Sequence, residues 1–184
     1  MLQEILVKGI VPIVVQKNDE AYCKVLEWSL KNIYRIAKVH SYVPDKEQLH
    51  KTLNQIKTKF GVNPNLISLR IKILAYLVDC NDHEAVGTLA EEFRTLAYAD
   101  QKEIVRIANV KSVARVINKV NVHHYLNLNP ESLFSLIVAI ILILNDEHPE
   151  IRSFILQQAS ISKLINKDSF KIESQSLCAK SNGD

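Results

Sequence analysis

The chain has 184 residues, of which 47% are hydrophobic and 23% are charged, and its formal net charge is +3. This balance is typical of a folded globular chain with one domain or one repeat array, and the small net charge does not by itself indicate nucleic-acid binding. Four glycines are too few for most antiparallel β folds and for phosphate-binding loops, so the composition favours helices.

Helical periodicity begins at the N-terminus. Residues 2–16 are predicted to form a helix or apolar segment that breaks near Pro12, and residues 17–41 form the next helix. The expected apolar positions of the second helix are Val25, Leu26, Trp28, Ile33 and Ile36. Trp28 and Tyr34 are expected to pack in the core or between helices rather than to stack on nucleic-acid bases.

Residues 45–60 form an amphipathic helix. Asp45 and Gln48 resemble a capping box at its start, and Gly61 is a plausible C-terminal cap. One stripe at helical spacing carries the apolar residues Leu49, Leu53, Ile56 and Phe60.

Two helices are predicted in the middle of the chain. Asn63 caps the first, Pro64 occupies its first turn, and residues 64–78 are apolar around most of the circumference, which predicts an inner helix. The helix over 82–98 is amphipathic, with Asp82 as its cap. Its expected inward positions are Val86, Leu89, Phe93, Leu96 and Ala97.

Three more helices follow. The helix over 100–120 has the expected core positions Ile104, Ile107, Ala108, Val113 and Ile117. Asn129-Pro130 opens a buried inner helix over 131–144, and His148-Pro149 opens a last helix over 150–165. We expect a helical-repeat domain over 1–167 and a polar, flexible tail over 168–184.

No membrane span or leader is expected. The apolar run 133–144 would span about 18 Å as a helix, short of the roughly 30 Å hydrocarbon core of a bilayer. The N-terminus lacks a basic leader and a small-residue cleavage site, which argues against a signal peptide. Three widely spaced cysteines without a CxxC pair fit a reducing compartment, so we expect a cytoplasmic protein.

Three polar clusters invite a chemical interpretation, and each has a structural one. His123-His124 lacks further ligands at zinc spacing. The run 79–84 combines Cys80 and His83 with acids, which a helix N-cap explains as well as a thiol nucleophile does. Acidic residues 146, 147 and 150 flank a helix start, where negative charge is favourable. We therefore expect no catalytic residues, no metal and no cofactor.

Basic residues are concentrated toward the N-terminus. Residues 1–60 hold ten Lys and Arg against six Asp and Glu, whereas residues 121–184 hold five against seven. The helix over 45–60 carries Lys46, Lys51, Lys57 and Lys59, which could contact RNA phosphates or form a solvated face. Neither a stacking platform nor an arginine-rich segment accompanies them.

Three arginines mark a possible internal repeat. Arg70, Arg106 and Arg152 each follow an apolar residue at the start of an apolar-periodic helix, and they are separated by 36 and 46 residues. These spacings bracket the period of HEAT and armadillo arrays, about 40–47 residues. The stretch "LNDEHPEIRSF", residues 144–154, resembles a HEAT repeat, and the resemblance implies a ladder between neighbouring units through Asp146 and Arg152, with Arg106 and Arg70 as further ladder residues. Arg70 lacks a preceding Asp and Arg106 a preceding Pro.

The predicted fold is an all-α solenoid of antiparallel helix pairs, HEAT/armadillo-like, with about seven or eight helices. The apolar helix followed by "LILNDEHPEIR" resembles the C-terminal part of the THADA-like proteins, helical-repeat scaffolds that support tRNA 2′-O-methylation by a partner methyltransferase. Because the chain begins in apolar sequence and solenoids need capped ends, we expect a piece of a longer array.

That resemblance implies a non-catalytic scaffold or adaptor that binds a protein partner, with tRNA reached through the partner. The alternative is an RNA-binding module that uses the basic N-terminal third.

Overall fold

Helices account for all the regular structure in the described part of the chain. The computed structural model describes residues 4–17, 20–40, 45–98, 101–120, 127 and 129–158. Within these ranges it contains eight α-helices and no strand, which confirms the all-α prediction for this part of the chain. The predicted tail 168–184 and His123-His124 lie outside the described residues.

In chain order the elements are η1 (Ile5–Ile10), α2 (Val11–Lys17), η2 (Glu20–Tyr22), α3 (Cys23–His40), α4 (Lys46–Phe60), α5 (Pro64–Leu77), α6 (His83–Leu96), α7 (Glu103–Ile117), α9 (Pro130–Leu144) and α10 (Pro149–Leu156).

The first helical segment runs on through Pro12, so the predicted break at this proline is wrong. η1 is a π-helix, and the Val11 N–H that follows it donates to the carbonyl of Leu6. Pro12 then lies in the first turn of α2, where its missing N–H leaves one position of this continuous segment without a main-chain donor. Leu6, Val11 and Val15 are buried along this continuous segment.

Side-chain caps start several helices where the sequence predicts them. Asn63 Oδ1 accepts from the N–H groups of Asn65 and Leu66, and Asp82 Oδ1 accepts from Ala85 N–H at 3.0 Å. Asn129 Oδ1 accepts from Ser132 N–H at 3.0 Å. Each such cap stabilises its helix by about 1 kcal/mol, because it satisfies an N–H that has no partner in the first turn.

Asp45 caps α4 from an unusual backbone conformation. Its φ of 54° is left-handed, and its Oδ1 accepts from Gln48 N–H at 3.1 Å, which is one of the two hydrogen bonds of a capping box. Gly61 is the C-terminal cap of α4, as predicted, but its φ of −62° is right-handed. The residue with the left-handed backbone at this helix is therefore an aspartate, which adopts this conformation more readily than most residues do.

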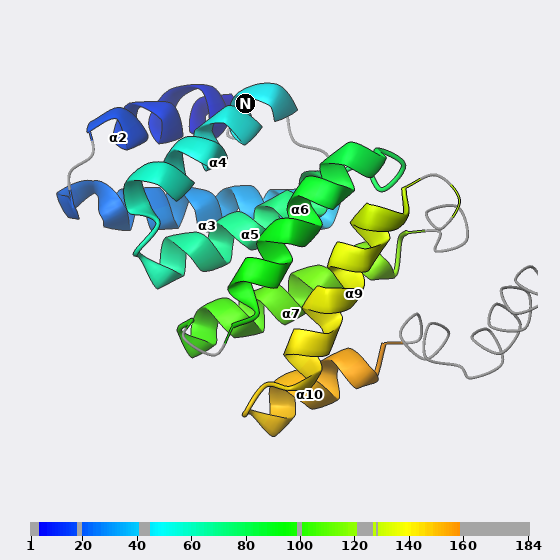
Figure 1. The fold of residues 1–184 in the computed structure, drawn as a ribbon. Helices are drawn as coiled ribbons and strands as arrows, with labels where there is room; N and C mark the ends of the chain where they lie inside the picture. The colour runs from blue at the N-terminus through cyan, green and yellow to red at the C-terminus, as the bar shows by residue number, and fades with distance from the viewer. Residues whose placement is uncertain are drawn as a thin grey trace, which may run out of the picture.

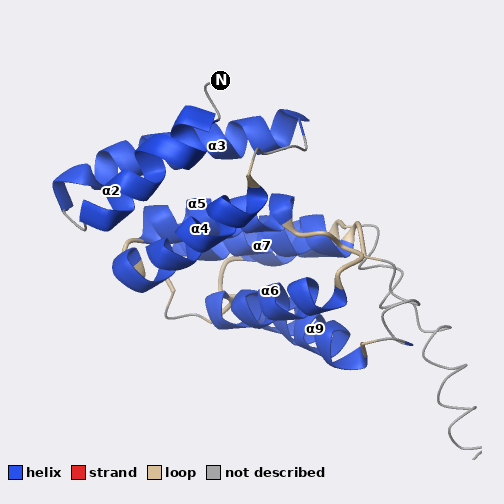
Figure 2. Cartoon of the chain, turned by 90° about the horizontal axis from the view of Figure 1, so that it is seen from above, coloured by secondary structure: helices blue, strands red, loops and turns tan. Residues whose placement is uncertain are grey.

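The helices pack in two layers (Figure 1). In one layer α3 packs on α5, α5 on α7, and α7 on α10. The other layer contains α4, which packs on α2 and α5, and α6, which lies along α9. Figure 2 shows α6 beside α9 and α5 beside α7 from a second direction. This packing is compatible with a helical-repeat array.

Most predicted core stripes are buried. All four stripe positions of α4 and all five inward positions predicted for the helix over 82–98 are buried. Three positions are wrong: Val25, Trp28 and Ile104 are exposed, Trp28 by 53%. The buried face of α3 carries Leu26 and Ile33, as predicted, together with Leu30 and Ala37. Both faces have helical spacing, so the position of the neighbouring helices decides between them.

One of the two predicted inner helices is enclosed and the other is not. Most side chains of α5 are buried, as expected. The last long helix, α9, exposes Phe134 by 66% and Ile141 by 51%, so its prediction as an inner helix is wrong. It packs against α6, α7 and α10, and no other described helix covers its remaining face. No described helix is long and apolar enough to cross a membrane.

Helices α6 and α9 approach closely at a glycine. A Cβ added at Gly87 would overlap Ser132 Oγ and would lie 3.2 Å from Ser132 Cβ. Ser132 Oγ in turn donates to the carbonyl of His83 at 3.2 Å. Gly87 therefore permits the close packing that joins these two helices.

Candidate functional site

Arg70 lies at a junction of three helices rather than in a repeated ladder. Its side chain is buried on α5, and its Nε donates to the carbonyl of Leu53 on α4 at 2.8 Å. Its Nη1 pairs with Glu92 of α6, and its Nη2 donates to Asn54 Oδ1 at 3.4 Å. Arg70 thus ties α4 to α6 through α5.

Arg106 makes the contact between neighbouring helix pairs that the sequence assigns to Arg152. The Arg106 guanidinium on α7 donates to Asp146 Oδ2 and to Glu147 Oε1, each at 2.9 Å. The side chains of Arg106 and Asp146 are only 4% and 2% exposed, so this ion pair is almost fully buried. Asp146 Oδ1 also accepts from His148 N–H at 2.9 Å, which fixes the carboxylate in the turn before α10.

The prediction that Arg152 reaches a neighbouring repeat is wrong. Its Nη1 donates to the main-chain carbonyls of Asp146 and Glu147, in the turn that precedes its own helix. Arg106 and Arg152 are both the fourth residue of their helices, whereas Arg70 is the seventh residue of α5. The three arginines therefore play three different roles, although each stabilises a junction between helices or a turn.

The four lysines predicted as RNA contacts do not form one free surface. Lys57 lies 3.2 Å from Glu92 Oε1, and Lys59 donates to the carbonyl of Val15 at 3.1 Å. Lys46 and Lys51 are exposed. Two of the four ammonium groups thus already bind groups of the protein, which reduces the charge available to phosphates.

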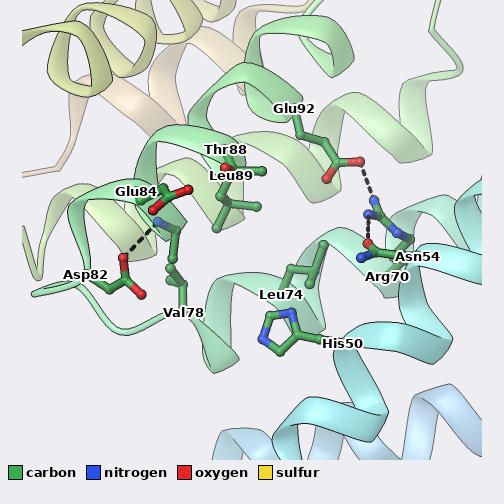
Figure 3. Close-up of a pocket in the computed structure, with 11 residues that line it drawn as sticks. His50, Asn54, Arg70, Leu74, Val78, Asp82, Glu84, Thr88, Leu89 and Glu92 are labelled. Atoms are coloured by element: carbon green, nitrogen blue, oxygen red, sulfur yellow. Dashed lines mark hydrogen bonds and ion pairs between the residues drawn. The ribbon is translucent and has the colours of Figure 1, made fainter.

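A polar pocket of about 330 Å³ lies between α4, α5 and α6 (Figure 3). Its walls carry the carboxylates of Asp82, Glu84 and Glu92 together with His50 and Arg70. Burial, followed by the charges of Lys46 and Arg70, lowers the pKa of His50 and favours its neutral form.

Three of the charged groups of this pocket, Asp82, Arg70 and Glu92, already have structural partners. Glu92 binds Arg70 and Lys57, and Asp82 caps α6. Figure 3 shows His50 and Asp82 on different walls, and no hydrogen bond joins His50 to another described residue of the pocket. The arrangement thus lacks the short acid–base contact that general acid–base chemistry uses.

Cys80 and His83 flank the turn between α5 and α6. Burial raises the pKa of the Cys80 thiol, which lowers its thiolate fraction near neutral pH. Asp82, between these two residues, acts as the N-cap of α6, as the structural interpretation of this run predicts. Within the described ranges no group of three or more His, Cys, Asp and Glu residues could hold a metal ion.

A second pocket, also of about 330 Å³, is lined by side chains from α3, α5, α7 and α10 and from the residues just after α7 and α10. We call it the basic pocket. Its lining contains five cationic side chains and no carboxylate: Lys38, Lys72, Lys111, Arg115 and Lys119. The other lining residues are Tyr34, Ala75, Tyr76, Ser112, Ala114, Asn118, Phe154 and Gln158.

Two tyrosines and an arginine fix the centre of the basic pocket. Tyr34 and Tyr76 meet edge to face, with ring centroids 5.6 Å apart. The Arg115 guanidinium lies over the Tyr76 ring, 3.3 Å from its centroid, and Arg115 Nε donates to the carbonyl of Ala75 at 3.2 Å. Burial and the neighbouring Tyr76 raise the pKa of Tyr34, so its phenol stays protonated.

Lys72 and Lys111 bring like charges close together in this pocket. Lys72 Nζ lies 6.0 Å from the centroid of the Tyr34 ring, within reach of a weak cation–π interaction. Partial burial, and then the charge of Lys111, lower the pKa of Lys72. Both effects disfavour the ammonium form of Lys72, because burial removes part of its hydration and the charge of Lys111 opposes it.

The basic pocket is not predictable from the sequence pattern. Its cations come from helices that are about 35 to 40 residues apart in the chain, the spacing of a helical repeat. Counting charges along the sequence therefore does not reveal that these cations lie in one pocket. Lys72 in α5 and Lys111 in α7 occur singly among apolar neighbours, and only the packing of α5 on α7 makes them adjacent.

No protein-family model, curated protein or solved structure was found to match this chain. The site is therefore interpreted from its own geometry and charge.

Proposed function

We propose that the chain is a non-catalytic helical-repeat scaffold that binds a partner protein at the basic pocket. The observation that carries this proposal is that four helices of one layer contribute side chains to a single pocket. Repeat arrays bind partners on surfaces of this kind, where each repeat adds one helix to an extended surface.

The buried arginines support a scaffold role. Arg70 and Arg106 use their guanidinium groups to hold helices together, so these charges serve packing rather than a reaction. A rigid array positions its surface side chains without loss of conformational entropy on binding. The resemblance to HEAT and armadillo proteins points in the same direction.

The resemblance to THADA-like proteins suggests a more specific form of this proposal. The partner would be a tRNA 2′-O-methyltransferase, and the array would support its reaction in the cytoplasm. Cells that lack the chain should then lose ribose methylation at one or more tRNA positions, measured by mass spectrometry of tRNA digests. Unchanged methylation would remove the tRNA part of the proposal and leave partner binding standing.

Site-specific photo-crosslinking in cells tests partner binding directly. A photoreactive phenylalanine analogue at position 111 lies in the basic pocket, and the same analogue at position 51 on α4 serves as the matched exposed control. We expect discrete protein adducts from position 111 and none of the same mass from position 51. Identical adducts from both positions, or none from position 111, would contradict the proposal.

The alternative, RNA binding by the N-terminal third, has less support. It depends on Lys46, Lys51, Lys57 and Lys59, and two of these lysines are engaged by Glu92 and by the carbonyl of Val15. The basic pocket, in contrast, has five cations in its lining and draws mainly on the middle of the chain.

A further inference from the structure

The two pockets have the same volume and opposite electrostatic character. The pocket between α4, α5 and α6 places three carboxylates beside Arg70 and a His50 whose neutral form is favoured, so acidic groups outnumber cations in its lining. The basic pocket carries five cations and no carboxylate in its lining. A large excess of one charge in a hollow attracts a ligand of the opposite charge.

Among the described residues, four of the five cations of the basic pocket have no carboxylate counter-ion in contact. In the described ranges no carboxylate lies within 4.0 Å of Lys38, Lys72, Lys111 or Lys119. Asp79 lies near the edge of the pocket that carries Lys119, because the charges of both residues influence the pKa of the Cys80 thiol. The mutual repulsion of Lys72 and Lys111 is therefore not relieved inside the molecule, and a bound anion would relieve it.

We propose that the basic pocket binds an acidic segment of a partner protein, with carboxylates placed between Lys72 and Lys111 and an apolar side chain against Phe154. This inference rests on the proposed scaffold function and specifies the chemistry of the partner. Ala75 and Ala114 line the pocket among the cations, so the ligand meets charge and short apolar groups on the same surface.

The aromatic groups favour a protein segment over single-stranded nucleic acid. Nucleic-acid bases stack on open aromatic faces, but Arg115 covers a face of Tyr76, and Tyr34 packs edge to face against the same ring. Arg115 is the one arginine of the lining, and its Nε is engaged by the carbonyl of Ala75. The remaining cations are lysines, which bind carboxylates as point charges.

Fluorescence anisotropy with labelled probes tests the inference on the full chain. The probes are an oligoglutamate peptide that contains leucines and an oligouridylate of equal charge, each at low and at physiological ionic strength. The variants Lys72→Gln and Lys111→Gln remove charge from the pocket, and Lys46→Gln and Lys51→Gln remove it from exposed positions on α4. Circular dichroism establishes that each variant is folded.

We expect the acidic peptide to bind more tightly than the oligouridylate. Each pocket substitution should weaken peptide binding by about tenfold, and each α4 substitution by less than about twofold. The inference is overturned if the peptide does not bind, if the α4 variants weaken binding equally, or if the oligouridylate binds more tightly with the same dependence on Lys72 and Lys111. Protein adducts at position 111 without peptide binding would overturn the acidic chemistry and leave the scaffold function intact.

Discussion

At the scale of single residues, Arg106 shows how the array is held together. Its guanidinium on α7 reaches the turn between α9 and α10, about 40 residues further along the chain, and binds a carboxylate that is itself fixed by a main-chain N–H. A buried ion pair is costly to break on one side, because the remaining charge stays buried without a partner. Arg152 makes a different contact, since it binds carbonyl oxygens of a turn near the surface.

Arg106→Ala should therefore destabilise the fold far more than Arg152→Ala. We expect a loss of about 3–5 kcal/mol in the free energy of unfolding for Arg106→Ala. For Arg152→Ala we expect about 1 kcal/mol, the value of an ordinary hydrogen-bonded contact. Urea denaturation followed by circular dichroism measures both values.

The double variant Arg106→Met, Asp146→Asn is the control for this comparison. It removes both charges and keeps an oxygen that can accept from His148 N–H, so it should recover part of the stability lost in Arg106→Ala. Equal losses for Arg106→Ala and Arg152→Ala would show that the buried pair does not carry the stability assigned to it.

Residue-level features differ in how well the sequence predicts them. The caps Asn63 and Asp82 are predictable, because a cap depends on the two or three residues that follow it. The partner of Arg106 is not predictable in this way, because it depends on which turn the next helix pair brings alongside. The sequence points to Arg and Asp as ladder residues, but it pairs Asp146 with Arg152 instead of Arg106.

At the scale of helices, the contact between α6 and α9 depends on a missing side chain. Gly87 faces Ser132 so closely that a Cβ at position 87 would overlap the serine hydroxyl. Alanine normally stabilises a helix interior by about 1 kcal/mol relative to glycine. The overlap opposes this gain, because the helices must separate or Ser132 must give up its hydrogen bond to the carbonyl of His83.

Gly87→Ala should therefore lower the free energy of unfolding, by about 1–3 kcal/mol, which is the range for overpacked sites. In a Ser132→Ala background the same change should cost less, because the overlapping hydroxyl is gone. The difference is the coupling energy of a double-mutant cycle, measured by thermal or urea unfolding. Equal effects in the two backgrounds would mean that Gly87 and Ser132 do not limit the packing of these helices.

Helix types and positions were predictable, but the place of each helix in the stack was not. The hydrophobicity of 131–144 indicates a buried helix, and the structure leaves Phe134 and Ile141 exposed on α9. Composition reports how much apolar surface a helix carries, and it does not report whether another helix lies on each side. The same limit explains Trp28, which lies on a helical face of α3 that no described helix covers.

At the scale of the whole molecule, the most extensive contacts join helices that are not consecutive in the chain, α6 with α9, α5 with α7 and α3 with α5. α5 packs on α3, α4 and α7, and α7 packs on α5, α6, α9 and α10, whereas α2 and α10 lie at the ends of the described array. In a helical-repeat array, which we propose for this chain, stability is the sum of local units and their interfaces, so the ends open more easily than the middle.

Amide hydrogen exchange measured by mass spectrometry should follow this order. We expect the slowest exchange in α5 and α7, and faster exchange in α10, which has eight residues, and in α2. Protection of equal strength along all helices would indicate a single cooperative unit and would contradict a graded array. The gradient should persist in Gly87→Ala, which would speed exchange mainly in α6 and α9.

The basic pocket is also a property of the whole molecule. Its cations come from α3, α5 and α7 and from Lys119, the second residue after α7, and only the packing of these segments brings them into one pocket. The charge count along the chain points to the N-terminal third, while packing gathers the excess charge near the centre of one layer. A prediction of this site needs the register between helices, which the sequence pattern does not specify.

The exposure of Trp28 has an optical consequence. Trp28 is the one tryptophan of the chain, and about half of its surface is open to water. Its emission in the folded state should already resemble that of an indole in water, so unfolding will shift the spectrum little. The same property makes it a useful reporter of association, because a protein that covers this face of α3 would move the emission to shorter wavelengths.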